Sequence, residues 1–153
     1  MNIVVRPATL EDAVAIEMLE REFADYLGSI GDTGPVWLDK ETFLKDGFGP
    51  EPAFSTLVAE TDGAIVGHVF YHPGYDIDRG GRIFQVIDLF VTENERRNGA
   101  GKALMLAVSE ACRAAGGLGL QWSVFRNNRQ AMAFYEKLGA RYLNGMALMY
   151  LKV

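Results

Sequence analysis

The chain has 153 residues, of which 49% are hydrophobic, and we expect one domain that spans residues 1–153. The net charge of −5 excludes the broad basic face of a nucleic-acid-binding protein, and no apolar run reaches the roughly 18 residues of a membrane span. The first residues lack a secretory signal and the single Cys112 cannot form an internal disulfide, so we expect a cytoplasmic protein.

The N-terminal segment predicts a strand followed by two helices. A β-rich run over 2–8 leads to Thr9 and Asp12, whose spacing resembles a capping box. The helix that follows carries apolar side chains at steps of three and four residues: Ile16, Leu19, Phe23 and Tyr26. A loop over 28–35 and a short helix over 40–45 complete this segment.

The central segment predicts three strands and a helix. The runs 54–61 and 64–72 flank the turn residues Asp62-Gly63, as in a hairpin. The run 82–91 is apolar enough to lie inside a sheet. The helix after the glycine-rich loop is expected to bury one face, formed by Leu104, Val108, Ala111 and Cys112.

The C-terminal segment predicts a strand over 120–125, a helix over 128–139 that ends at Gly139, and a closing strand over 147–153. The whole chain then has the order β-α-α-β-β-β-α-β-α-β, without an internal repeat or a low-complexity linker. This order indicates an α/β (α+β) fold.

The loop ERRNGAGKAL (95–104) lies between a strand and a helix, where backbone amides can bind a phosphate. A nucleoside-triphosphate P-loop is excluded, because Arg96 and Ala103 occupy the positions of its first glycine and its serine or threonine. A dinucleotide fingerprint is excluded because Leu104 replaces its third glycine. Taken alone, such a loop is more often a solvated turn with a basic face, so the rest of the chain must decide.

Two motifs together resemble the GNAT superfamily of N-acetyltransferases. Residues 96–101 fit its R/Q-x-x-G-x-G/A signature, and residues 124–139 fit its second motif through Val124, Asn128, Ala131, Phe134, Tyr135 and Gly139. The segments VVRPAT, LKDGFG, LVAE, DLFV and FYEKLGA look like the spermidine/spermine and thialysine branch. The resemblance implies a mixed, mostly antiparallel sheet flanked by about four helices, and a homodimer.

The resemblance also implies transfer of an acetyl group from acetyl-CoA to a primary amine of a small molecule, by direct attack in a ternary complex. The amine would be a diamine, a polyamine, an amino acid or a lysine analogue. No metal is expected. The implied cofactor-binding residues are Leu89, Phe90 and Val91 beside the pantetheine arm, Arg96, Arg97, Asn98, Gly99, Ala100, Gly101 and Lys102 at the pyrophosphate, and Asn128 and Ala131.

Tyr135 and Asp88 are the catalytic candidates that the resemblance implies. Tyr135 occupies the position of the general acid, although an arbitrary helix tyrosine would simply pack against the sheet. The branch has a glutamate before the aspartate, and here that residue is Ile87. Asp88 would then act as part of the base or bind the substrate ammonium, and a bulge in this strand would decide which way it faces.

The implied substrate-binding residues are Tyr26, Gln121, Trp122 and Ser123. The acidic residue expected beside Tyr26 is Leu27, which disfavours a long polyamine as the substrate. Trp37 either covers the acceptor amine or anchors a loop.

His68 and His72, four apart on one strand, would face the same side. They are more probable as sheet residues than as metal ligands, because no further Cys or His completes a site, but either could act as a base. Two other functions stay open at this point: acetylation of a protein lysine or N-terminal amine, and a non-catalytic acetyl-CoA-binding regulatory module.

Overall fold

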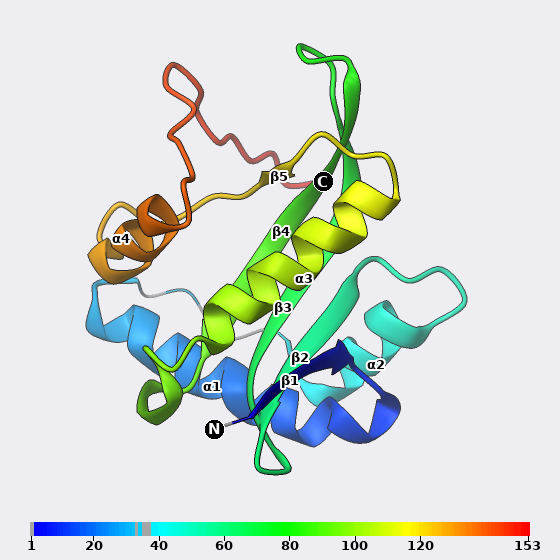
Figure 1. Ribbon diagram of the computed structural model, residues 1–153, viewed down its shortest axis with the longest axis vertical. Coiled ribbons are helices and arrows are strands. Elements are labelled where there is room, and N and C mark those ends of the chain that lie inside the picture. Colours follow the sequence, from blue (N-terminus) through cyan, green and yellow to red (C-terminus); the bar gives the residue numbers. More distant parts are fainter. Residues whose placement is uncertain (1, 33, 35–37) are drawn as a thin grey trace. The chain divides into compact units, whose positions relative to one another are not determined.

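The computed structural model describes residues 2–32, 34 and 38–153. Its elements, in chain order, are β1 (Ile3–Pro7), the 3-10 helix η1 (Leu10–Asp12), α1 (Ala13–Ser29), α2 (Lys40–Phe48), β2 (Ser55–Thr61), β3 (Ala64–Asp76), β4 (Gly81–Val91), the 3-10 helix η2 (Glu93–Glu95), α3 (Ala100–Ala114), β5 (Leu120–Gln121) and α4 (Arg129–Lys137) (Figure 1). They form two compact units, residues 1–123 and residues 124–153. No helix in the described part of the chain is both long enough and apolar enough to cross a membrane.

The five strands form one sheet in the order β1-β2-β3-β4-β5. The first three neighbouring pairs are antiparallel, and β5 runs parallel to β4 (Figure 1). The expected mixed, mostly antiparallel sheet is therefore confirmed.

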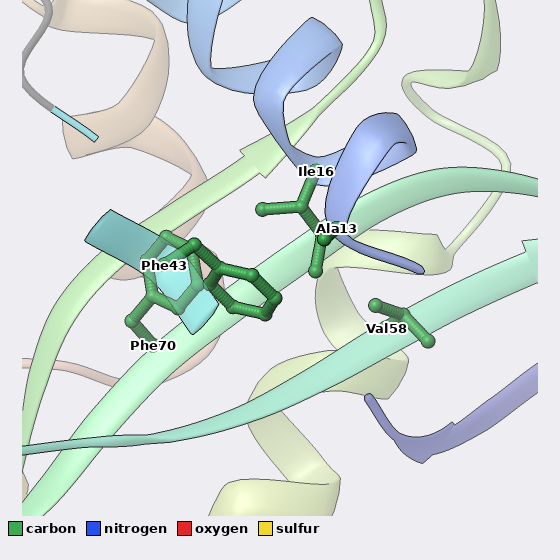
Figure 2. Packing of buried hydrophobic residues seen from close by; sticks show 5 residues of the cluster. All are labelled: Ala13, Ile16, Phe43, Val58 and Phe70. Atoms are coloured by element: carbon green, nitrogen blue, oxygen red, sulfur yellow. The ribbon is translucent and has the colours of Figure 1, made fainter. Parts of the chain in front are cut away.

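Helices cover both faces of this sheet in the first unit. Ala13 and Ile16 of α1 and Phe43 of α2 pack with Val58 and Phe70 of the sheet (Figure 2). On the other face, α3 lies over the sheet and buries Leu104, Val108 and Cys112, as its periodicity predicts (Figure 1).

The start of α1 is fixed by a small polar network. The backbone N–H of Thr9 donates to Asp12 Oδ2 at 2.7 Å as part of the expected capping box between these two residues. Arg6 binds both carboxylate oxygens of Asp12, at 2.7 and 3.0 Å, and its Nε donates to Glu60 at 3.1 Å. These contacts tie β1, β2 and the helix start together.

The C-terminal predictions need correction. The strand expected over 120–125 is limited to Leu120–Gln121, and residues 147–153 form no strand. The side chains of the C-terminal run are exposed, for example by 88% at Leu148 and 85% at Leu151. A strand needs a neighbour that accepts its backbone hydrogen bonds, and an apolar run in the sequence does not supply one.

Candidate active site

A β-bulge in β4 determines which side chains face α1. Phe70 pairs with Asp88, but the next residue, Tyr71, pairs with Val86, so that Ile87 is an extra residue without a partner on β3. His68, two residues before Phe70, pairs with Phe90, two residues after Asp88. Directly paired residues share a face, so His68 and Asp88 lie on the same face of the sheet.

Glu20 of α1 reaches this face. It follows Ile16 by one helical turn, and Ile16 is fully buried against the sheet. The Oε1 atom of Glu20 lies 2.7 Å from Nε2 of His68, and one acidic oxygen or ring nitrogen from each of Glu20, His68 and Asp88 lies within 4.8 Å of the others. We call these three residues the acid-histidine cluster.

The polar atoms of the acid-histidine cluster are poorly satisfied. The His68 side chain is 0% exposed and that of Glu20 is 11% exposed. Despite the short distance between them, Glu20 Oε1 and both ring nitrogens of His68 have no aligned hydrogen bond among the described residues. Buried polar groups are normally hydrogen-bonded, so such a set marks a candidate functional site.

The electrostatics of the cluster favour proton uptake. The carboxylate oxygens of Glu20 and Asp88 lie within 4.8 Å of one another, and at that limit two negative charges would repel by about 3.5 kcal/mol at an effective dielectric constant near 20. Burial and the neighbouring Glu20 raise the pKa of Asp88 well above its usual value, and the hydrogen bond from the Leu89 N–H only partly opposes this.

Aromatic rings surround the cluster. The His68 ring lies 4.6 Å from that of Phe70 and 6.4 Å from that of Phe90, and Phe23 of α1 stacks on Phe90 at 5.0 Å. These rings limit access of water to the imidazole, which strengthens the electrostatic interactions within the cluster.

One imidazole and two carboxylates can also bind a divalent cation. Two protein ligands that each lie 2.0–2.1 Å from one tetrahedral zinc ion are about 3.4 Å apart. The 2.7 Å between His68 Nε2 and Glu20 Oε1 is too short for two such ligands and lies in the distance range of a hydrogen bond, although the two groups are not aligned for one. The geometry thus favours a proton over a metal ion.

The Asp88 carboxyl binds a backbone donor in the segment that the family resemblance places beside the pantetheine arm. Its Oδ1 accepts the Leu89 N–H at 2.9 Å. Asp88 would have to release this N–H before Leu89 could donate it to a substrate oxygen.

The glycine-rich loop ends in a strained turn at the start of α3. Arg97 has φ of 67° and Gly99 has φ of 98°, a left-handed conformation that suits glycine. Gly99 is the N-cap residue of α3, and because glycine has no side chain it leaves the first N–H groups of the helix without a side-chain cap. This end of α3 therefore fits an anionic group such as a pyrophosphate.

Arg96 connects this loop to the predicted acceptor residue Tyr26. Its Nε donates to the Val91 carbonyl at 2.9 Å, and its guanidinium lies 4.8 Å from the ring centre of Tyr26 and 5.3 Å from that of Phe90. The loop, the end of β4 and α1 thus meet through this one side chain.

Three predicted site residues lie together in the second unit. Asn128 caps α4, because its Oδ1 accepts the Ala131 N–H at 3.1 Å. Tyr135 lies on the same helix, half-buried, with its ring 5.2 Å from that of Phe134.

The remaining candidates have mixed outcomes. Gln121 donates to Asp76 Oδ2 at 3.0 Å, which gives it a structural contact at the β3–β5 side of the sheet. Trp122 and Ser123 follow β5, and Trp122 is half-buried whereas Ser123 is exposed. His72 is partly exposed, with Nδ1 2.9 Å from the Pro73 carbonyl oxygen. Trp37 lies outside the described residues.

Sequence reasoning missed Glu20. One signal was available: Glu20 interrupts the apolar face of α1 between Leu19 and Phe23, at the helical spacing of the buried side chains. Its partner could not be inferred, because the bulge that turns Asp88 toward it has no signature in the sequence.

The chain is similar to known acetyltransferases over most of its length. Residues 16–140 match the acetyltransferase (GNAT) family. Thialysine N-epsilon-acetyltransferase of Bos taurus is 31% identical over 149 residues, which covers 92% of this chain and 85% of the relative. An L-ornithine acetyltransferase of Arabidopsis thaliana is 31% identical over 103 residues, covering 67% of this chain and 40% of the relative.

Solved structures agree on the fold. The ribosomal-protein-alanine N-acetyltransferase of Brucella melitensis biovar Abortus superimposes with a TM-score of 0.76 at 20% identity, covering 99% of this chain and 100% of that chain. The GNAT family uses acetyl-CoA as its cosubstrate. The chain therefore belongs to the GNAT family and is an N-acetyltransferase similar to the thialysine branch.

Proposed function

We propose that the protein transfers the acetyl group of acetyl-CoA to the terminal amine of a small molecule, with a short diamine or a basic amino acid as the preferred class. The observation that carries the proposal is Asp88, a carboxylate with a raised pKa at the bulge of β4. Two relatives support the substrate class, because their names specify thialysine and L-ornithine, which are amino acids with a terminal amine.

Amine activation is the task that Asp88 would perform. An ammonium group with a pKa near 10.4 loses its proton at pH 7 at a cost of roughly 4–5 kcal/mol. A carboxylate with a raised pKa is a better proton acceptor than an ordinary one, because the proton transfer is less unfavourable. Before the transfer, its negative charge attracts the ammonium group.

The chain's own residues would hold acetyl-CoA, which when bound supplies the activated acetyl thioester. The uncapped start of α3 at Gly99 to Lys102 would bind the pyrophosphate, with Arg96, Arg97 and Asn98 beside it. The main chain of Leu89 to Val91 would lie along the pantetheine arm, and Asn128 and Ala131 would contact the cofactor from α4.

Tyr135 would donate a proton to the departing sulfur, as the family motif implies. Tyr26, Gln121, Trp122 and Ser123 are the proposed acceptor-binding residues. The amine would attack the acetyl group directly in a ternary complex of enzyme, acetyl-CoA and amine. The proposal also includes a homodimer and a cytoplasmic location.

The experiment is a thiol-release assay with the purified full chain, acetyl-CoA and a panel of ornithine, lysine, thialysine, putrescine, spermidine and a lysine-containing peptide. We expect release with the short diamine or the amino acids and less with spermidine. Activity confined to the peptide would indicate a protein acetyltransferase instead. Binding of acetyl-CoA without release by any amine would indicate a regulatory module.

A further inference from the structure

The chain lacks the glutamate that its branch places before the aspartate of β4. Ile87 stands there, 50% exposed and without a proton-accepting atom. On the same face as Asp88, however, the fold buries two further titratable side chains, Glu20 and His68, neither of which belongs to the motifs of the family. Their position needs an explanation, because a buried acid and a buried imidazole lower the stability of the fold unless hydrogen bonds or opposite charges compensate for the lost water.

We propose that Glu20 and His68 are positioning residues that share a proton with Asp88, and that this three-residue unit receives the proton of the substrate ammonium in place of the missing glutamate. The inference rests on the proposed acetyltransferase function. Asp88 is the member that meets the substrate, since it lies at the bulge and is only partly buried. His68 and Glu20 act through it.

The geometry suits a proton that enters at Asp88 and is stabilised behind it. One ring nitrogen of His68 lies within 4.8 Å of a carboxylate oxygen of Asp88, and Nε2 of His68 lies 2.7 Å from Glu20 Oε1. A proton taken up by Asp88 can be shared with the imidazole, whose positive charge Glu20 then compensates. None of the atoms that would share the proton in Glu20 and His68 is committed to an aligned hydrogen bond elsewhere in the described chain.

The step balances without a further reactant. The N–H bond of the ammonium breaks, its electron pair stays on nitrogen, and the proton goes to Asp88. That electron pair forms the N–C bond with the acetyl carbon, the C–S bond breaks, and its pair leaves with the sulfur. Tyr135 gives its hydroxyl proton to the departing sulfur, and the second proton that the nitrogen loses as the amide forms restores the Tyr135 hydroxyl. Asp88 finally releases one proton to water per turnover.

The other charges near this face are held by separate contacts. The Arg96 guanidinium lies over the rings of Phe90 and Tyr26, and the Glu22 carboxylate accepts hydrogen bonds from the Thr92 hydroxyl and the Glu93 N–H. In the described residues, the acidic groups that the fold brings within 4.8 Å of a His68 ring nitrogen are Glu20 of α1 and Asp88 of β4.

The first test changes the charge and the shape of residue 20 separately in the full chain. Glu20→Gln keeps the shape and removes the charge, whereas Glu20→Asp keeps the charge and shortens the side chain. We expect kcat/KM for the best amine at pH 7 to decrease in the order wild type, Glu20→Asp, Glu20→Gln, with about a tenfold or larger loss for Glu20→Gln. In Glu20→Gln, the acid limb of the pH profile of kcat/KM should move to lower pH, because a negative charge has been removed from beside Asp88.

The matched control is Glu17→Gln on the same helix, where the carboxylate pairs with Arg21 at 3.3 Å. It should leave kcat/KM and its pH profile unchanged. The KM for acetyl-CoA should stay at the wild-type value in every variant, and circular dichroism should confirm that each variant is folded.

The second test is a double-mutant cycle with His68→Gln. If His68 and Glu20 act as one unit, the double variant should lose about as much activity as the worse single variant. Should His68→Gln fail to fold, the order of the two Glu20 variants and their pH profiles decide the question alone.

Three results would overturn the inference: Glu20→Asp less active than Glu20→Gln, an acid limb that does not move, or losses that multiply in the double variant. Activity that EDTA abolishes and zinc restores would also overturn it, in favour of a metal site. In all these cases wild-type turnover persists, so the proposed function survives. A wild type that acetylates no amine would instead reject the proposed function itself.

Discussion

Asp88 combines a proposed catalytic role with a cost to stability, because burial and Glu20 raise its pKa above the ordinary value near 3.9. We predict that Asp88→Asn lowers kcat by about 10²- to 10⁴-fold. The same variant should be more stable than the wild type near pH 8, since the folded protein no longer holds a disfavoured charge. Because the pKa of Asp88 is higher in the folded state than in the unfolded state, this carboxyl destabilises the fold only when the pH is above its unfolded-state pKa.

Chemical denaturation at pH 8 and at pH 4 measures this effect. The stability advantage of Asp88→Asn should be present at pH 8 and should shrink toward pH 4, where the wild-type carboxyl is protonated when folded. A variant that is less stable than the wild type at pH 8 would contradict the electrostatic description of the cluster.

Tyr135 allows a second test at the residue scale. Tyr135→Phe keeps the ring that lies beside Phe134 and removes only the hydroxyl. We predict a loss in kcat of about 10²-fold or more with little change in acetyl-CoA affinity, because a general acid acts in the transition state and not in cofactor binding. Single-turnover kinetics and calorimetric titration with acetyl-CoA separate the two. Unchanged turnover would remove Tyr135 from the mechanism.

The turn between β4 and α3 is the element on which cofactor binding should depend. Gly99 has φ of 98°, which costs a residue with a Cβ atom about 1–2 kcal/mol. We predict that Gly99→Ala lowers the free energy of unfolding by about that amount and weakens acetyl-CoA binding, because the start of α3 shifts. Urea denaturation and titration with acetyl-CoA measure both effects.

Gly28→Ala is the matched control for that substitution. Gly28 lies in the last turn of α1 with an ordinary φ, and an added Cβ would meet no atom within 4 Å. It should leave cofactor affinity unchanged and stabilise the helix by about 0.5–1 kcal/mol. If both variants behave alike, the left-handed turn is not what the cofactor site requires.

The elements differ in how far the sequence could predict them. Thr9 and Asp12 indicated the helix start correctly, and the alternation around Asp62-Gly63 indicated the β2–β3 hairpin, because these signals depend on neighbouring residues. The missing strand at 147–153 and the bulge at Ile87 depend on pairing with distant strands. The acid-histidine cluster joins three elements through that bulge, so periodicity alone could not assemble it.

At the scale of the whole molecule, the exposed C-terminal run favours self-association. The C-terminal residues Leu148, Met149, Tyr150 and Leu151 are each at least 85% exposed. Contiguous exposed apolar side chains often mark an interface, and we propose that a second copy of the chain covers them. Light scattering should give twice the monomer mass, and Leu148→Glu with Leu151→Glu should give the monomer. A monomeric wild type at high protein concentration would contradict this.

The family and the sheet follow from the sequence because two motifs lie in order along most of one chain. One domain over residues 1–153 stays a prediction, as does the choice of amine. The acceptor side is harder to predict because it departs from the branch pattern at Leu27 and Ile87, where the sequence shows what is missing and not what replaces it.

The most direct test of the proposed function is CoA release by the purified wild-type chain with acetyl-CoA, at equal concentrations of ornithine, lysine, thialysine, putrescine and spermidine. We predict amine-dependent release, with kcat/KM higher for the short diamine or the amino acids than for spermidine, and an acetylated amine of matching mass. Acetyl-CoA binding with no release above spontaneous hydrolysis for any amine would contradict the account.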